Sequence, residues 1–425
     1  MRYEKLSEWL QWQESLHPKS IDLGLTRVAG VHKKLHPGYE PPITLSVAGT
    51  NGKGSSVAML EAILREQGYR TGVYTSPHLQ VYNERIRIDG NMADDAALCA
   101  TFDHIDQARG DVTLSFFEFG TLAALDIFAR ERVDVQILEV GLGGRLDAVN
   151  ILDADAALIT SIGVDHVDWL GSTRDMIAME KAGIFRPGKP AIVGDPNPPA
   201  CLCAHAGVSL LGRDFDYDVS GSFWSWRGLG TALDRLAWPA IPGRHQFMNA
   251  AAAIQMLRSL ADLLPVSDQA IRNGLKNVRL PGRFQYFGGG RVPILLDVAH
   301  NPQSAAALAG YLQEQFPGKT IRAVFSVMRD KDIHGIVDAV RNAVACWYLA
   351  PLKLDRAARD GDLSCLLQGM GIENIRNGYK TVAEAVGAAF TDAQPDDLIV
   401  VFGSFFLASE FLALDLQSGL ISGSV

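Results

Sequence analysis

The sequence lacks the cysteine pattern of an exported, disulfide-bonded protein. It has five cysteines, an odd number, and none of them forms a CxxC pair. Such usage is typical of a reducing compartment, where disulfides are rare. Cys201 and Cys203 lie close together, but no second Cys/His pair stands near them in the sequence, so a zinc site is not expected there.

Long hydrophobic runs are also missing. The first twenty residues spread charges among their apolar residues, which does not match the apolar core of a signal peptide. The most apolar long stretch, Phe247 to Val266, is interrupted by Asn249, Gln255, Arg258 and Asp262. That composition favours a packed helix over a bilayer span. We therefore expect a cytoplasmic protein with no membrane partner.

An excess of positive charge is absent as well. Lys and Arg together number 39 against 48 Asp and Glu, which gives a formal net charge of -9. This balance argues against a nucleic-acid partner, and an anionic substrate must meet a local basic pocket instead. The hydrophobic share of 48% and the charged share of 20% are those of a folded globular protein, so disorder is excluded.

The order of apolar segments predicts an α/β protein with two domains. A chain of 425 residues corresponds to roughly two to three domains. From residue 43, short β-branched segments alternate with amphipathic ones, which is typical of a mostly parallel sheet covered by helices. The first domain is expected to have strands at 43–48, 71–75, 134–140, 156–161 and 190–193 and helices at 54–67 and 116–130.

Glycine and proline interrupt this alternation near residue 281. Pro281, Gly282 and the run Gly288 to Gly290 predict a linker at 281–291, between an N-terminal domain at 1–280 and a C-terminal domain at 292–425. The second domain is expected to have strands at 293–298, 320–327, 345–350 and 397–402 and helices at 303–315 and 333–342. The predicted fold is thus a P-loop-type, mostly parallel sheet domain followed by a smaller Rossmann-like α/β domain.

A glycine-rich turn, Gly49 to Ser55, joins the first expected strand to the first expected helix. Small residues let backbone N–H groups approach phosphate oxygens, while the helix N-terminus and the Lys53 ammonium add positive potential. The turn departs from the GxxxxGK[ST] pattern, because Val47 holds the first glycine position and Gly54 separates Lys53 from Ser55. It predicts a phosphate cradle, with an ordinary glycine-rich turn as the alternative.

Polar residues follow the other expected strands. Ligands of open parallel sheets bind beyond the carboxyl ends of the strands. Ser76 follows the second strand, Glu139 ends the third and His166 lies beyond the fourth. Such donors suit Mg²⁺ ions that bridge nucleotide phosphates. Taken singly they are better interpreted as a cap, a solvated charge and a loop residue, but their shared edge beside Lys53 favours a metal site.

Two further segments are less specific. The turn Gly141 to Asp147 lacks the GxGxxG spacing of a dinucleotide site and indicates a tight loop near a ligand. Lys181 falls near the end of an expected helix, where the macrodipole favours a cation. By itself it is interpreted as a surface lysine.

Together these segments resemble the folylpolyglutamate synthase family of Mur-type ligases. The residues that carry the resemblance follow the family order over most of the chain: GTNGKGS at 49–55, TSPHL at 75–79, EVGLGGRLD at 139–147, DH at 165–166, EKAGI at 180–184, HQ at 245–246, NAA at 249–251, PGR at 281–283 and DVAHNP at 297–302. Ile21 to Leu25 also resembles the bifunctional bacterial members of the family.

The resemblance implies an ATP-dependent carbon–nitrogen ligase that adds L-glutamate to dihydropteroate and to reduced folates through an acyl phosphate. It implies a monomer whose partners are small molecules. The implied catalytic residues are Lys53, His166 and Lys181. The implied ATP contacts are Thr50, Asn51, Gly52, Lys53, Gly54, Ser55, Asn249, Arg283 and Asp297. The implied ligands of two Mg²⁺ ions are Ser76, Glu139, His166 and Lys181, the last as a carbamate. Dihydropteroate is implied to bind at Ser115, Phe116, Phe117, Glu118, Leu146, Asp147 and Ala148.

Three alternatives share parts of this pattern. They are a folylpolyglutamate synthase without the dihydrofolate synthase activity, a Mur ligase of cell-wall precursors, and an ATP-binding regulatory switch that needs no glutamate. The segments at 75–79 and 297–302 favour folate. One departure from the family is the stretch Gly403 to Leu407, which has phenylalanine where tyrosine or histidine usually follows the GS pair, and this leaves details of the second domain open.

Overall fold

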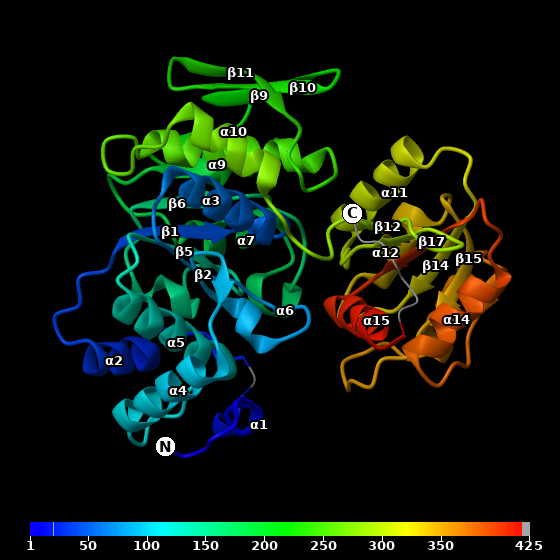
Figure 1. Ribbon diagram of the computed structural model, residues 1–425, viewed down its shortest axis with the longest axis horizontal. Helices are drawn as coiled ribbons and strands as arrows, with labels where there is room; N and C mark the ends of the chain where they lie inside the picture. Colours follow the sequence, from blue (N-terminus) through cyan, green and yellow to red (C-terminus); the bar gives the residue numbers. More distant parts are fainter. Residues whose placement is uncertain (20, 419–425) are drawn as a thin grey trace. The chain divides into compact units, whose positions relative to one another are not determined.

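The computed structural model describes residues 1–19 and 21–418, and the chain divides into two compact units. Unit 1 comprises Met1–Ala240 and Gln246–Arg279, and unit 2 comprises Ile241–His245 and the chain from Leu280 onward. Each unit has its own β-sheet (Figure 1). No helix within the described ranges is both long enough and apolar enough to cross a membrane.

Unit 1 is built on an eight-stranded sheet with a separate three-stranded sheet. Its strands are β1 Ile43–Ala48, β2 Thr71–Tyr74, β3 Ile86–Ile88, β4 Asn91–Met92, β5 Val135–Glu139, β6 Ala156–Ile159, β7 Ala191–Val193, β8 Val208–Leu210, β9 Phe215–Ser220, β10 Phe223–Gly228 and β11 Thr231–Ala237. Its helices are α1 Leu6–Leu16, α2 Thr26–Leu35, α3 Lys53–Gln67, η1 Tyr82–Arg85, α4 Asp95–Arg109, α5 Phe116–Glu131, η2 Ala148–Ile151, α6 Val167–Leu170, α7 Arg174–Ala182, α8 Ala200–Cys203, α9 His245–Ser259, which starts in unit 2, and α10 Asp268–Asn277.

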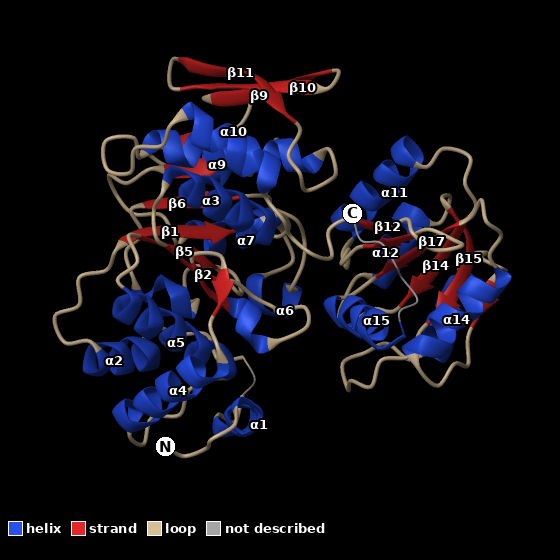
Figure 2. Ribbon diagram, viewed as in Figure 1, coloured by secondary structure: helices blue, strands red, loops and turns tan. Residues whose placement is uncertain are grey.

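The large sheet has the strand order β4-β3-β2-β5-β1-β6-β7-β8, and the strands from β2 to β8 in this order are parallel. Val47 of β1 pairs with Glu139 of β5 and with Leu158 of β6, so the carboxyl ends of these central strands are level. Helix α3 lies on one side of the sheet and α5 on the other (Figure 2). Polar residues that follow β1, β2, β5 and β6 therefore meet at a single edge.

The core of unit 1 explains the apolar residues of α5. Its side chains Leu122, Leu125 and Phe128 are buried in one cluster with Tyr74 of β2 and Leu138 of β5. The helix begins at a capping box, in which the Ser115 hydroxyl accepts from the N–H of Glu118. A hydroxyl at this position satisfies a backbone donor that the helix itself leaves unpaired. The expected helix at 116–130 thus extends by one residue.

Unit 2 is a smaller sheet with the strand order β12-β13-β17-β14-β15-β16, in which only β12 is antiparallel to its neighbour. The strands are β12 Gln285–Phe287, β13 Ile294–Leu296, β14 Ile321–Phe325, β15 Val344–Leu349, β16 Ile375–Arg376 and β17 Leu398–Phe402. The helices are α11 Pro302–Gln315, α12 Ile333–Val340, α13 Asp360–Gly369, α14 Val382–Asp392 and α15 Phe405–Ser418.

The predicted fold class is confirmed, with two local differences. Strand β12 lies inside the segment 281–291 that the sequence predicts as a linker, and its Phe287 is buried against unit 2. The triplet of glycines that suggested a linker begins directly after this strand. The apolar stretch from Phe247 to Val266 is helical only as far as Ser259, and the chain then turns ahead of Pro265, a residue that disfavours helix before it.

Candidate active site

The glycine-rich turn between β1 and α3 is pressed against its neighbours on two sides. A Cβ atom on Gly49 would lie 1.9 Å from the Thr160 hydroxyl, and one on Gly52 would lie 2.5 Å from Oδ1 of Asn249. Both glycines have φ values in the left-handed region, 151° and 86°. Glycine is required here for space as well as for backbone conformation. The turn contacts Asn249 of α9, a residue implied to bind ATP.

The segment that follows β6 holds this turn through backbone hydrogen bonds. The N–H of Thr50 donates to the carbonyl of Ser161 at 2.8 Å, and the N–H of Asn51 donates to the Ser161 hydroxyl at 3.0 Å. The Thr160 hydroxyl donates to the carbonyl of Asn51 at 2.6 Å. The Thr50 hydroxyl accepts from the N–H of Gly163 at 2.9 Å. Sequence reasoning did not single out Thr160, Ser161 or Gly163, because hydroxyl and glycine residues after a strand are common.

Two lysines meet at one carbonyl oxygen of the turn. Nζ of Lys53 and Nζ of Lys181 each donate to the carbonyl oxygen of Gly49 at 3.0 Å. Lys181 is 4% exposed, so its interpretation as a surface lysine is wrong. Burial, and after it the neighbouring Lys53 ammonium, lowers the pKa of the Lys181 amine to about 7. Desolvation disfavours the charged form of an amine, so near neutral pH a large share of Lys181 is uncharged.

Two of the implied metal ligands are adjacent. The N–H of Ser76 donates to Oε2 of Glu139 at 3.2 Å, which joins the ends of β2 and β5. His166 lies on the loop after β6, in the left-handed conformation with a φ of 52°. In the described residues no three His, Cys, Asp or Glu side chains are grouped as a metal site. A Mg²⁺ ion that is bound together with nucleotide phosphates needs only a few protein ligands, because the phosphates and water supply the remaining oxygens.

The two segments implied to bind dihydropteroate both contact residues 21–27, the region where Ile21 to Leu25 resembles the bifunctional members of the family. Nη2 of Arg27 donates to Oε1 of Glu118 at 3.0 Å, and the N–H of Gly24 donates to the carbonyl of Leu146 at 3.3 Å. Residues 21–27, 115–118 and 146–148 therefore form one wall. Arg27 is the residue of this wall that sequence reasoning missed, because a single arginine at the start of a helix carries no pattern.

Burial divides the implied substrate residues into two groups. Phe116, Phe117 and Leu146 are half-buried and offer side-chain surface to a ligand. The other four are buried: Ser115, Glu118, Asp147 and Ala148. The Asp147 carboxylate accepts from the N–H groups of Leu142 and Val149 at 2.8 and 3.1 Å, which fixes the turn from 141 to 147. Burial raises the pKa of the Asp147 carboxyl to about 6.

Arg283 and Asp297, two of the implied ATP contacts, belong to unit 2. The Asp297 carboxylate accepts from the N–H groups of Phe284 and Ala299 at 3.0 and 2.8 Å, and burial raises its pKa to about 6. The Arg283 guanidinium lies over the Phe405 ring, 5.1 Å from its centroid. Phe405 is the residue that departs from the family, and this stacking gives it a place beside an implied ATP contact.

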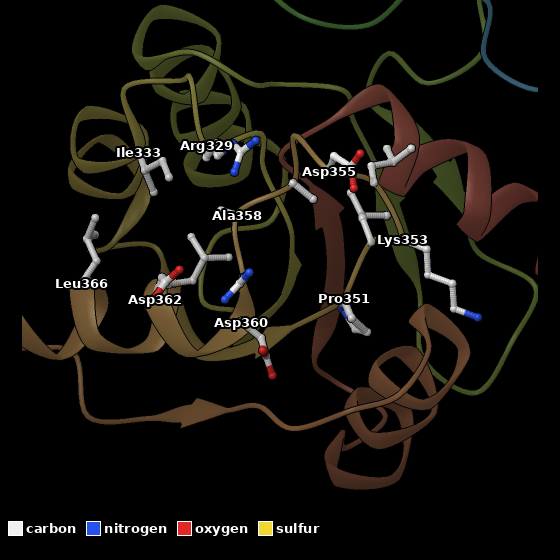
Figure 3. Close-up of a pocket in the computed structure, with 14 residues that line it drawn as sticks. Arg329, Ile333, Pro351, Lys353, Asp355, Ala358, Asp360, Asp362 and Leu366 are labelled. Atoms are coloured by element: carbon white, nitrogen blue, oxygen red, sulfur yellow. The ribbon is translucent and has the colours of Figure 1, made fainter.

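Unit 2 also has a pocket of about 990 Å³ where β14 and β15 end (Figure 3). Hydrophobic side chains such as Leu352 and Leu363 line it together with charged side chains of both signs. The charged residues are Arg329, Lys353, Asp355, Arg359, Asp360 and Asp362. Within the described part of the chain, neither Arg329 nor Arg359 pairs with a carboxylate.

Known proteins with this arrangement are Mur ligases. Residues 47–194 match the family model of the Mur ligase middle domain, and residues 282–405 match that of the Mur ligase, glutamate ligase domain. These two matches identify the chain as a Mur-type ligase, the class that the sequence predicted.

Curated relatives narrow the class. The chain is 44% identical to dihydrofolate synthase/folylpolyglutamate synthase of Escherichia coli over 94% of its own length and 93% of the relative's. It is 38% identical to the protein of the same name from Haemophilus influenzae, over 96% of this chain and 97% of the relative. The chain belongs to the dihydrofolate synthase/folylpolyglutamate synthase family.

Solved structures agree with this membership. E. coli FolC in complex with DHPP and ADP superposes with a TM-score of 0.91 and 42% identity, covering 97% of this chain and 98% of that one. A bifunctional folylpolyglutamate synthase/dihydrofolate synthase with Mn, AMPPNP and L-glutamate bound gives a TM-score of 0.88 at 42% identity, with the same coverage.

Proposed function

We propose that this protein is an ATP-dependent ligase that joins L-glutamate both to dihydropteroate and to reduced folates. The observation that carries the proposal is the geometry of the glycine-rich turn at 49–55, which we call the phosphate turn. Two lysines donate to its Gly49 carbonyl, and four backbone and hydroxyl contacts fix Thr50 and Asn51. Relatives with the same overall fold bind ADP, AMPPNP and L-glutamate, which supports the same ligands here.

The chemistry begins with the carboxylate of the dihydropteroate or folate acceptor, which is a poor electrophile at neutral pH. One carboxylate oxygen attacks the γ-phosphorus of ATP, the bond to the β-phosphate oxygen breaks, and ADP leaves. The product is an acyl phosphate. The amino group of L-glutamate then attacks the acyl carbon, loses a proton, and the tetrahedral intermediate expels phosphate to leave an amide. The protein contributes mainly positioning and charge stabilisation to such a phosphoryl transfer.

Lys53 is proposed to stabilise the charge on the phosphoryl group while it is transferred. Its ammonium donates to the carbonyls of Gly49 and Thr50, at 3.0 and 3.4 Å. A phosphate bound at this turn would replace these two carbonyls as the partner of the ammonium. The N–H groups at the start of α3 face the same region and favour an anion. A divalent cation held by Ser76, Glu139 and His166 would neutralise the charge of the nucleotide phosphates.

Lys181 is proposed to act as a carbamate. Its amine is buried beside the Gly49 carbonyl, and a neutral amine is the form that reacts with CO₂, giving a carbamate and releasing a proton. A buried ammonium would repel the cation that accompanies ATP, whereas carbamate oxygens suit a hard cation. The location of Lys181 on the phosphate turn supports this role.

Dihydropteroate is proposed to lie along the wall formed by residues 21–27, 115–118 and 146–148. Phe116 and Phe117 present aromatic rings that suit the flat pteridine and aminobenzoyl groups. L-glutamate is proposed to bind in the pocket of unit 2. An amino acid with two carboxylates and an ammonium needs charges of both signs, and the pocket offers unpaired arginines beside aspartates.

One experiment separates the alternatives. ADP release by the purified protein is measured with L-glutamate and either dihydropteroate, a reduced monoglutamate folate, or a cell-wall precursor. Turnover with both folate compounds is expected. Turnover with the reduced folate alone would leave only folylpolyglutamate synthase, turnover with the cell-wall precursor would indicate a different Mur ligase, and ADP release independent of any acceptor would indicate a regulatory switch.

The protein is also proposed to act as a cytoplasmic monomer. The sequence has five cysteines, an odd number without a CxxC pair, which is typical of a reducing compartment. Light scattering coupled to gel filtration would contradict this proposal if it gave the mass of a dimer.

A further inference from the structure

A buried carboxylate beside the loop at 160–166, which follows β6, has no role in the chemistry described above. Asp195 follows β7 and is 2% exposed. Its Oδ2 accepts from the N–H of Ile162 at 2.6 Å, and its Oδ1 accepts from the N–H of Asn197 at 2.8 Å. A carboxylate removed from water in this way is held in one orientation by its donors.

Arg174, at the first turn of α7, completes this arrangement. Its Nη2 donates to both oxygens of Asp195 at 3.2 and 3.1 Å, and to the carbonyl of Asn197 at 2.8 Å. Its Nε donates to the carbonyl of Ile162 at 3.0 Å. Asp195 and Arg174 thus hold the N–H and the carbonyl of the same residue, Ile162, from one side.

Ile162 is the residue between those that fix the phosphate turn. Ser161, just before it, accepts from the N–H groups of Thr50 and Asn51, and Gly163, just after it, donates to the Thr50 hydroxyl. His166 follows on the same loop, and Lys181 lies at the other end of the helix that Arg174 begins. The pair therefore touches the two segments that carry implied metal ligands.

We propose that Asp195 and Arg174 are positioning residues that set the phosphate turn, the His166 loop and helix α7 in register for nucleotide and metal binding. This proposal rests on the proposed function. Asp195 and Arg174 bind both polar groups of Ile162 and so fix the two peptide planes on either side of this residue, as hydrogen-bonded partners behind metal ligands fix those ligands in general.

The test uses Asp195→Asn and Arg174→Lys in the full chain. The asparagine directs N–H hydrogens at a backbone donor, and the lysine keeps its charge but loses the donor to Ile162. Hydrogen exchange in peptides covering 47–56 and 160–166 is measured without nucleotide or metal, and at least about tenfold faster exchange is expected. In the assay, the Mg²⁺ concentration for half-maximal activity and the KM for ATP should rise ~10-fold, with the KM for L-glutamate unchanged.

A matched control is the pair of buried Arg109 and partly buried Asp106 on α4. Arg109 donates to Asp106 and to the carbonyl of Val112 at 2.9 Å, so it also joins a carboxylate and a backbone group, away from the phosphate turn. Arg109→Lys should lower thermal stability and leave the Mg²⁺ requirement unchanged. If it raises the Mg²⁺ requirement as much as Arg174→Lys does, or if exchange at 47–56 and 160–166 stays at the wild-type rate in both test variants, the positioning role is overturned.

Failure of this proposal and failure of the proposed function are distinguishable. Lys53→Ala serves as the reference, since it touches the phosphate turn directly. An active Lys53→Ala enzyme would remove the phosphate-turn assignment itself. An inactive Lys53→Ala enzyme, with unchanged Mg²⁺ and ATP requirements in Asp195→Asn and Arg174→Lys, would remove only the positioning role. If Asp195→Asn does not fold, Arg174→Lys decides the outcome alone.

Discussion

The two units differ in how far the residues at the carboxyl ends of their parallel strands are preorganised by contacts within the protein. In unit 1 the turn after β1 is fixed by neighbouring segments, and two of its glycines have no room for a Cβ atom. In unit 2 the corresponding edge has an open pocket whose arginines are unpaired in the described residues. Phosphate requires a fixed array of N–H donors, whereas an amino acid can be held by long side chains that order when it binds.

The largest expected effect is at the phosphate turn. Lys53→Ala should lower kcat by ~10²-fold or more, because the ammonium would no longer offset charge on the transferring phosphoryl group. The fold should persist, since Lys53 is only partly buried. Steady-state ADP release and circular dichroism measure the two effects. Wild-type turnover in this variant would contradict the assignment of the preorganised turn in unit 1 to phosphate binding.

A loss of similar size is expected at Lys181. Lys181→Ala should lose most turnover but still bind ATP, and a short-chain carboxylate in solution should partly restore activity by supplying the missing oxygens. Lys181→Arg should also be inactive, because a guanidinium keeps a charge that the metal rejects. High-resolution density that shows an unmodified lysine in an active, metal-loaded enzyme would exclude the carbamate, and so would full activity of Lys181→Arg.

Next come the glycines, which separate steric from conformational demand. Gly52→Ala places a Cβ atom 2.5 Å from Asn249, while Gly371→Ala in unit 2 has a similar φ of 78° and nothing within 4 Å. The second variant should lose about 1 kcal/mol of unfolding free energy from backbone strain alone, and the first about 1–3 kcal/mol more. Urea unfolding measures both. Equal losses would mean that Asn249 moves aside without cost.

A comparable but pH-dependent effect is expected for the buried carboxyls, one in each unit. Asp147 and Asp297 have pKa values raised by burial to about 6 from the ordinary 3.8. A raised pKa means that the folded state holds the proton more tightly, so the unfolding free energy falls as pH rises from about 4 to about 6. Each carboxyl accounts for at most about 3 kcal/mol of this fall.

Asn at either position removes its own share of the pH dependence. Thermal unfolding of Asp147→Asn and Asp297→Asn, followed from pH 4 to pH 7, measures it. Because both carboxyls accept two backbone N–H groups, the two variants should behave alike. A pH profile identical to wild type would show that folding does not raise the pKa of the replaced carboxyl.

The smallest effect is expected in the pocket of unit 2. Arg329→Ala should raise the KM for L-glutamate by about tenfold, the value of one charge-assisted contact, and leave the KM for ATP unchanged. Arg341→Ala is the matched control, because Arg341 is an exposed arginine of unit 2 that pairs with Asp338 outside the pocket. A shift in the KM for glutamate in the control alone would place the amino acid elsewhere.

The regular α/β pattern could be predicted from the sequence because it depends on local periodicity. Strand β1 was placed at its observed bounds, and α3 begins one residue before its expected start. The three-stranded sheet β9 to β11 and the first helices, α1 and α2, were not predicted. Val28, Val31 and Leu35 of α2 do recur at helical spacing, so this signal was present and was missed. The three-stranded sheet packs through Trp224 on Phe247, and α1 packs through Trp9 on Phe102.

The sequence by itself determined which chemistry is present: a glycine-rich turn with Lys53, carboxylate and hydroxyl groups after neighbouring strands, and segments in the family order. Only the tertiary structure decided how these groups act on one another. It buried Lys181 against the Gly49 carbonyl, where desolvation lowers its pKa, and it brought Asp195 to Ile162 from 33 residues away. Burial and long-range hydrogen bonds depend on how separate segments pack, and no local pattern in the chain encodes them.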